Sequence, residues 1–124
     1  MLNLLIIFFG GGLGSVSRYA ISLLFITQKS LATLLVNIIG CFLIAIIDSL
    51  LKKYNINFFF SSPQTRLLFI TGFLGGFTTY SSFLLDFFNH LHANQSMVAV
   101  LYIFFSIVLG LGAFLLGLEV AKFF

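Results

Sequence analysis

The side chains of this chain that could do chemistry are amides and hydroxyls placed inside long apolar segments. They are Asn37, Thr33, Thr78, Thr79, Ser81, Ser82, Tyr102 and Ser106. All of them can donate hydrogen bonds. The three carboxylates, Asp48, Asp86 and Glu119, fall instead near the ends of these segments. An apolar interior with donors and no central acid suits a small anion, and it argues against a proton-coupled cation exporter.

Aromatic rings add a second resource, because the rim of a ring carries partial positive charge. Tyr80 and Phe83 are three residues apart and would project from the same side of a helix. Their rims could solvate an anion, although a chain with 18 Phe also produces such pairs by chance. We find no nucleophile–base–acid constellation and no metal-ligand spacing in the sequence, so we expect no enzyme.

These groups must be positioned by membrane helices. The chain has 124 residues, of which 60% are hydrophobic and 7% charged, and its mean hydropathy is +1.19. Because a helical span needs about 20 apolar residues, we predict an all-α membrane protein that forms a single domain over residues 1–124. The four expected spans are about 4–26, 33–51, 63–88 and 97–121. The six basic residues are scattered, which excludes a nucleic-acid patch.

The third span is predicted to break at mid-membrane, within residues 72–83. This stretch holds three glycines and a run of Thr and Ser where lipid-facing Leu and Ile would be expected. Gly costs about 1 kcal/mol in a helix interior relative to Ala, and Thr and Ser compete for backbone hydrogen bonds. A broken backbone is tolerated in hydrocarbon only where protein buries it or where it lines a wet cavity. We therefore expect function at this stretch.

Several polar or small residues in the spans allow two interpretations. Arg18 either extends to the nearby interface or holds a vestibule positive for an anion, and Asn37 either joins two helices or lines a pore. Gly10 and Gly14 fit the small-xxx-small pattern of closely packed helices. In the fourth span a stripe of small and hydroxyl side chains is either a packing seam or a polar track. Its members are Tyr102, Ser106, Gly110, Ala113 and Gly117.

Three segments resemble the signature segments of the CrcB/Fluc fluoride channel family. They are residues 11–19, residues 33–37 followed by Gly40, and residues 72–83. The resemblance covers nearly the whole chain, including the four-span plan. Its most specific part is the run Gly-Gly-Phe-Thr-Thr-Tyr-Ser-Ser-Phe at 75–83, which follows an Asn in the preceding span.

The resemblance implies a passive, fluoride-specific channel that exports fluoride, lowers its cytoplasmic concentration and confers fluoride resistance. It also implies an antiparallel, dual-topology homodimer with two pores and a structural sodium ion on the dimer axis. The expected location is the inner or plasma membrane, as a multi-pass protein, with fluoride and membrane lipid as partners.

The same resemblance assigns roles to residues at matching positions. Asn37 would be the pore amide, and Tyr80 and Phe83 the aromatic box. The carbonyls of Gly75 and Thr78 would bind sodium, and Arg18 would keep the vestibule positive. The polar track would be lined by Thr33, Ser82, Tyr102 and Ser106. Two positions depart from the family pattern, since the first box residue is Tyr80 rather than the usual Phe and Gly110 stands where a third hydroxyl is expected.

The basic residues bear on orientation. With four spans, the side that holds both termini collects Lys52, Lys53, Arg66 and Lys122, which favours cytoplasmic termini. A strong bias of this kind would require an oppositely inserted paralogue as partner instead of a second copy.

Two different functions also fit a small protein with four spans. One is a small-multidrug-resistance-type exporter, which needs a membrane-embedded Glu that the first span lacks. The other is a helper subunit that packs against another membrane protein and carries no ion flux. Fluoride flux from the purified chain would distinguish a channel from both.

Overall fold

The computed structural model describes residues 1–54 and 62–124, and every regular element in these two stretches is helical. The elements in order are α1 (Leu2–Leu24), α2 (Lys29–Tyr54), α3 (Ser62–Arg66), the π-helical segment η1 (Leu67–Leu74), α4 (Gly75–Phe77), α5 (Tyr80–His92) and α6 (Ser96–Ala121). From α3 to α5 the chain forms one interrupted run, Ser62–His92. With α1, α2 and α6, this run makes four helices that are long and apolar enough to cross a membrane, which confirms the predicted four spans.

The helices extend beyond the predicted spans at several ends. The second helix begins at Lys29 rather than Thr33, because the Gln28 carbonyl accepts the N–H of Leu31 at 3.0 Å and so starts the first turn directly. The third run ends at His92 rather than Phe88. A hydropathy pattern ends at the first polar residues, whereas backbone hydrogen bonds carry a helix beyond the apolar segment. Of the predicted connection between the second and third spans, residues 55–61 lie outside the described part of the chain.

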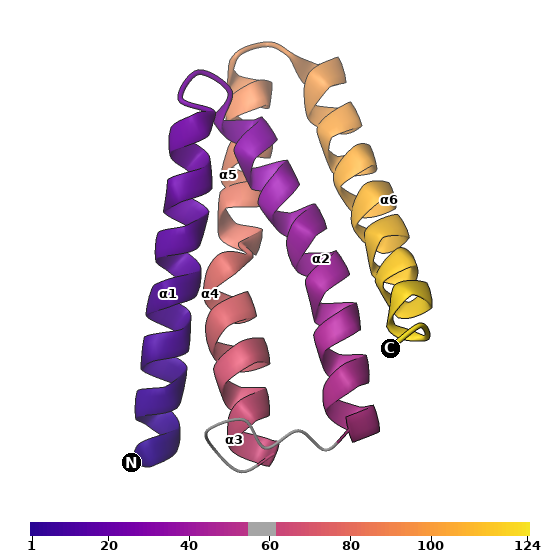
Figure 1. Ribbon diagram of the computed structural model, residues 1–124. Helices are drawn as coiled ribbons and strands as arrows, with labels where there is room; N and C mark the ends of the chain where they lie inside the picture. The colour runs from indigo at the N-terminus through magenta and orange to yellow at the C-terminus, as the bar shows by residue number, and fades with distance from the viewer. Residues whose placement is uncertain (55–61) are drawn as a thin grey trace.

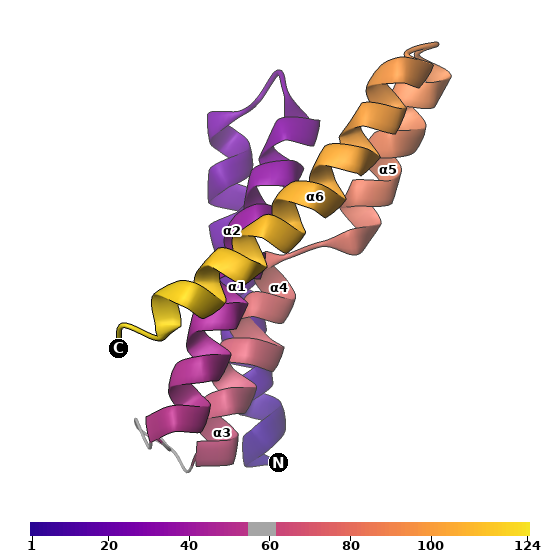
Figure 2. The same cartoon turned by 90° about the vertical axis from the view of Figure 1, so that its right-hand side faces the viewer.

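The four spans are arranged as two closely packed pairs. The first pair is α1 against η1 and α4, and the second is α2 against α6. Both termini and the C-terminal end of α2 lie toward the same end of the molecule (Figure 1). Seen from the side, α5 and α6 run together and lean away from α1 and η1 (Figure 2). This divergence begins at the interruption between α4 and α5.

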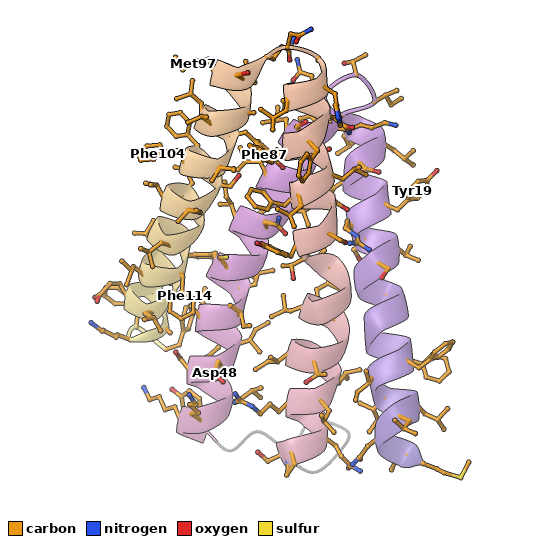
Figure 3. The ribbon with its side chains drawn as sticks, turned by 180° about the vertical axis from the view of Figure 1, so that it is seen from behind. Tyr19, Asp48, Phe87, Met97, Phe104 and Phe114 are labelled. Atoms are coloured by element: carbon orange, nitrogen blue, oxygen red, sulfur yellow. The ribbon has the colours of Figure 1, made fainter. Side chains whose placement is uncertain are left out.

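Large apolar side chains cover the outside of the bundle. Tyr19, Met97 and Phe104 point away from the helices (Figure 3) and are 65%, 71% and 57% exposed. A soluble protein would bury such side chains, whereas in a bilayer they contact lipid or another subunit. Charged side chains gather near the helix ends instead. Asp48 forms ion pairs with Lys52, at 2.7 Å, and with Arg66, and the second of these pairs joins α2 to α3.

Glycines allow α1 to approach the third run closely. A Cβ on Gly14 would overlap the carbonyl oxygen of Phe73, and a Cβ on Gly76 would overlap the carbonyl oxygen of Gly11. A Cβ on Gly10 would lie 2.6 Å from the carbonyl oxygen of Leu68. The small-xxx-small interpretation of α1 is therefore confirmed. Backbone contact of this kind replaces the hydrophobic driving force that is missing between helices in lipid.

Gly76→Ala should destabilise the protein, whereas Gly12→Ala should not. The new methyl at position 76 must push α1 away from α4, and overpacking of this kind costs about 1–3 kcal/mol. Gly12 has no atom within 4 Å of the position where a Cβ would stand. Thermal unfolding of the purified protein in detergent measures the difference. Equal melting temperatures for the two variants would contradict the close packing.

Candidate functional site

The interruption of the third run occurs at two threonines. Thr78 (φ −78°, ψ 159°) and Thr79 (φ −153°, ψ 117°) are extended, between α4, which ends at Phe77, and α5, which begins at Tyr80. The predicted break within residues 72–83 is therefore confirmed. The glycines of this stretch are themselves helical, so their role is close packing, and the threonines form the break.

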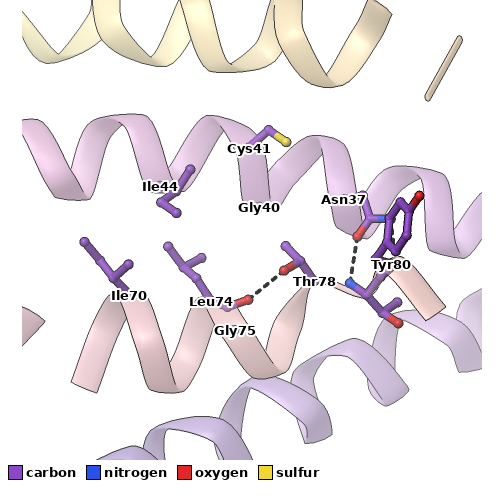
Figure 4. Close-up of a pocket in the computed structure, with 10 residues that line it drawn as sticks. Asn37, Gly40, Cys41, Ile44, Ile70, Leu74, Gly75, Thr78 and Tyr80 are labelled. Atoms are coloured by element: carbon purple, nitrogen blue, oxygen red, sulfur yellow. Dashed lines mark hydrogen bonds between the residues drawn. The ribbon is translucent and has the colours of Figure 1, made fainter. Parts of the chain in front are cut away.

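Asn37 on α2 holds the break through both ends of its amide. Its Oδ1 accepts the Thr79 N–H at 2.9 Å, and its Nδ2 donates to the Thr79 carbonyl at 3.1 Å. Figure 4 shows the Asn37 side chain reaching from α2 to the extended residues. Because one partner must donate and the other must accept, the two bonds fix which way the amide points. One hydrogen of Nδ2 is left for another acceptor.

The break withdraws the usual hydrogen-bond donors from two carbonyls. In a continuous helix the N–H of Thr79 would bond to the carbonyl of Gly75, but it bonds to Asn37. Likewise the N–H of Ser82 would bond to the carbonyl of Thr78, but it bonds to Thr79 Oγ1 at 3.2 Å. Gly75 and Thr78 line a cavity of about 330 Å³ beside α2 (Figure 4). The two residues predicted to bind sodium thus share one cavity.

Neighbouring carbonyls are already used. The Leu74 carbonyl accepts both the N–H of Thr78, at 3.0 Å, and its hydroxyl, at 2.9 Å. The Gly76 carbonyl faces α1, where the Ser15 hydroxyl lies 3.4 Å away. Gly40 lets the break lie against α2, since a Cβ on Gly40 would overlap the Thr78 methyl group. The break is therefore held on two sides.

Thr79 also starts α5. Its Oγ1 accepts the N–H of Ser82 as the N-cap and lies within 3.2 Å of the hydroxyls of Ser81 and Ser82. Capping satisfies one of the N–H groups that the first turn of a helix leaves free. Thr79 was expected among the interior hydroxyls but was not predicted as a residue of the site. The available signal was that Thr79 follows Thr78 directly, in a Thr-Thr pair that can end one helix and cap the next.

Three aromatic rings form a row after the break. The ring centroids of Tyr80 and Phe83 are 5.7 Å apart, and those of Phe83 and Tyr102 are 5.5 Å apart. The row therefore joins the two predicted box residues on α5 to a predicted track residue on α6. Tyr80 is 73% exposed on the single chain.

A second cavity, of about 560 Å³, lies between α1, α2 and α5. Three predicted site residues line it, namely Arg18, Thr33 and Ser82. Asp86 also lines it, is buried, and accepts the Tyr102 hydroxyl at 3.3 Å. Sequence analysis placed this carboxylate at a span end. Its position one helical turn after Ser82, on the same face of α5, was the signal that it belongs with the site.

The stripe along α6 serves in two ways. Gly110 packs against α2, with the Cys41 sulfur 3.6 Å from its Cβ position, and a Cβ on Gly117 would lie 2.5 Å from the Phe42 carbonyl oxygen. This half is a packing seam. Toward the other end, Ser106 donates to the Tyr102 carbonyl at 2.6 Å, and Thr33 on α2 donates to the Lys29 carbonyl at 3.3 Å. Both hydroxyls thus bond to their own helices.

Known proteins similar to this chain agree with one another. The family model described as "CrcB-like protein, Camphor Resistance (CrcB)" matches residues 5–118. The chain is 41% identical over 119 residues to a protein of Azobacteroides pseudotrichonymphae, covering 93% of this chain and 92% of the relative. It is 41% identical over 126 residues to a protein of Gloeothece citriformis, covering 98% of each, and 42% identical over 117 residues to a protein of Flavobacterium psychrophilum, covering 91% of each. All three relatives are named "Fluoride-specific ion channel FluC".

The cap at Thr79 makes a local prediction. Thr79→Val keeps the shape and the backbone contacts with Asn37 but removes the capping oxygen, so it should destabilise α5 by about 1 kcal/mol. Thr79→Ser keeps the oxygen and is the matched control. Thermal unfolding in detergent compares the two. Equal stability of the valine and serine variants would contradict a stabilising role for the Thr79 cap.

Proposed function

The chain belongs to the CrcB family, and we propose that it is a passive, fluoride-specific ion channel in the cell membrane that lets fluoride leave the cytoplasm. The assignment to a family of channels also makes it a transport protein rather than an enzyme. The observation that carries the proposal is the gathering of hydrogen-bond donors and aromatic rims around the broken third helix. The names of the relatives supply the ion.

The chemistry of this site fits a small anion. Fluoride is strongly hydrated, so a selective pore must offer preplaced donors that replace water without holding the ion too tightly. The remaining Nδ2 hydrogen of Asn37 and the rims of Tyr80 and Phe83 are such groups. The hydroxyls of Thr33, Ser82, Tyr102 and Ser106 extend the polar lining, and those of Thr33, Tyr102 and Ser106 would have to leave their present acceptors to donate to the ion. Arg18 adds positive charge to the cavity between α1, α2 and α5, which the Asp86 carboxylate also lines while it accepts the Tyr102 hydroxyl.

The channel is proposed to act as an antiparallel homodimer with two pores. Tyr80 carries one half of the proposed box yet is 73% exposed on one chain, and a second subunit would cover it. A two-fold axis near the break would bring the carbonyls of Gly75 and Thr78 from both subunits together. Carbonyl oxygens are the ligands that hard cations prefer, so the donor set fits a structural sodium ion. Sodium would supply positive charge that offsets these carbonyl dipoles.

Charge placement supports cytoplasmic termini and leaves one variant of the assembly open. Lys52 and Lys53 lie in the last turn of α2, Arg66 in α3 and Lys122 at the end of α6, on the side of the termini, whereas Lys29 lies at the opposite end of α2. If this bias fixes a single orientation, the partner is an oppositely inserted paralogue rather than a second copy. The proposed site is the same in either assembly.

Liposomes that contain only this protein should lose fluoride rapidly down its gradient and retain chloride. Donors held in place around a narrow pathway fit the smaller ion, and the larger one gains too few contacts to replace its water. Ion-selective electrodes for both anions measure the two effluxes, with protein-free liposomes as control. Equal loss of chloride would contradict the assignment as a fluoride-specific channel.

The aromatic row makes a second functional prediction. If ring rims solvate the ion, Tyr80→Phe should conduct at least as well as the parent, and Phe83→Ile should abolish flux by removing a positive edge. Phe104→Ile, on the exposed face of α6, is the matched control. Fluoride efflux from liposomes with equal amounts of reconstituted protein measures the effect. A severalfold slower Tyr80→Phe would show instead that the Tyr80 hydroxyl binds the ion.

A further inference from the structure

Asn37 touches the two proposed ion sites at once. Its Oδ1 and Nδ2 are both bonded to the backbone of Thr79, and Thr79 lies between Thr78 and Tyr80, the first ring of the aromatic row, in a cavity that all three residues line. Asn37 itself lines the cavity together with Gly75 and Thr78. A side chain that only lined an anion pore would need its donor alone, yet here the acceptor is also used.

The acceptor bond decides what happens to the Gly75 carbonyl. Thr79 is buried, so its N–H must find a partner. Two acceptors compete for it, namely the Asn37 Oδ1 that it uses and the Gly75 carbonyl four residues earlier, which a continuing helix would offer. When Asn37 takes the N–H, the Gly75 carbonyl stays available.

We propose that Asn37 is a positioning residue for the cation site, because by binding the Thr79 N–H it keeps the Gly75 carbonyl free to coordinate a cation. The inference rests on the proposed function for the presence of a cation at this cavity. It extends that function by coupling the two sites. The Asn37 amide presents one hydrogen to the anion pathway, and its oxygen keeps the Gly75 carbonyl free for the cation.

The other contacts at the break agree with this role. The Leu74 carbonyl is occupied by Thr78, and the Gly76 carbonyl faces Ser15 on α1. Gly75 and Thr78 are the positions whose helical donors have been drawn away, one by Asn37 and one by the Thr79 hydroxyl. Without an acceptor at position 37, the turn at Gly75 would close and α4 would extend by one hydrogen bond.

Two substitutions separate the acceptor from the donor. Asn37→Asp keeps an oxygen that accepts the Thr79 N–H and loses the two donor hydrogens, so it should abolish fluoride efflux. Because its carboxylate also attracts cations, its response to sodium should be at least as strong as that of the parent. Asn37→Leu has a similar size but no acceptor, so it should lose both. Asn37→Ser is a smaller variant whose hydroxyl is one bond too short to reach Thr79, so it should lose the sodium response like Asn37→Leu, whereas its effect on fluoride efflux should be milder than that of Asn37→Asp because it keeps one donor. Cys41→Ala, one turn further along the same cavity, is the matched control.

The readout is the melting temperature of the purified protein in detergent, titrated with sodium chloride against N-methyl-D-glucamine chloride at constant ionic strength. The parent, Cys41→Ala and Asn37→Asp should be stabilised by sodium. Asn37→Leu and Asn37→Ser should need about tenfold more sodium for the same rise, as expected for one competing hydrogen bond in each subunit. A purely structural role would lower the melting temperature equally in both salts.

The outcomes distinguish this inference from the proposed function. If Asn37→Leu, or Asn37→Ser where the leucine variant does not fold, keeps the sodium response of the parent, the positioning role is wrong and the channel assignment stands. If Asn37→Asp loses the response together with the flux, the acceptor is not what sets the carbonyl free, and the inference is again wrong. A parent that conducts fluoride without any sodium response also overturns it. A parent that passes no fluoride contradicts the proposed function itself.

Discussion

The pair of hydrogen bonds between the Asn37 amide and the backbone of Thr79 is the constraint on which the rest of the site depends. A helix interrupted inside an apolar span exposes N–H and C=O groups that no water is present to satisfy, and each unsatisfied group costs several kcal/mol. The amide of Asn37 offers one acceptor and one donor, and Thr79 presents one donor and one acceptor. No hydroxyl or carboxylate side chain could answer both needs at that distance, because each lacks either the reach or the donor.

Glycines complete this solution by bringing neighbouring helices close enough to support the break. Gly40 lets α2 approach Thr78, and Gly10, Gly14 and Gly76 let α1 lie against the backbone of the third run. The glycines are thus distributed on the partners of the break as well as within it. This placement explains why the third run stays helical up to Phe77 despite its glycines, and why the chain becomes extended only where side chains replace the lost backbone bonds.

The spans and the break could be predicted because both follow from local composition. Hydropathy identifies an apolar segment of sufficient length, and the cluster of glycines and hydroxyls at 72–83 identifies where a helix is weakest. Thr79 and Asp86 were given no role, because the local signals at these positions do not reveal their partners on other helices, namely Asn37 and Tyr102. The ends of the spans were shifted for a different reason. Hydropathy reports whether a residue lies in lipid or in water, whereas a helix ends where its backbone hydrogen bonds end. The two boundaries therefore differ by a few residues.

The exposed position of Tyr80 connects the fold to the proposed assembly. Its neighbour in the aromatic row, Phe83, contacts Tyr102 within the same chain, whereas Tyr80 faces outward from the break. Phe83 is packed within its own subunit, and Tyr80 lies at the surface. The proposed aromatic box would therefore be complete only when a partner subunit covers Tyr80. Tyr80 also lines the cavity that Gly75 and Thr78 share. One interface would therefore complete both sites, and it would do so in a single step, because the two sites are joined through Thr79 and the amide of Asn37.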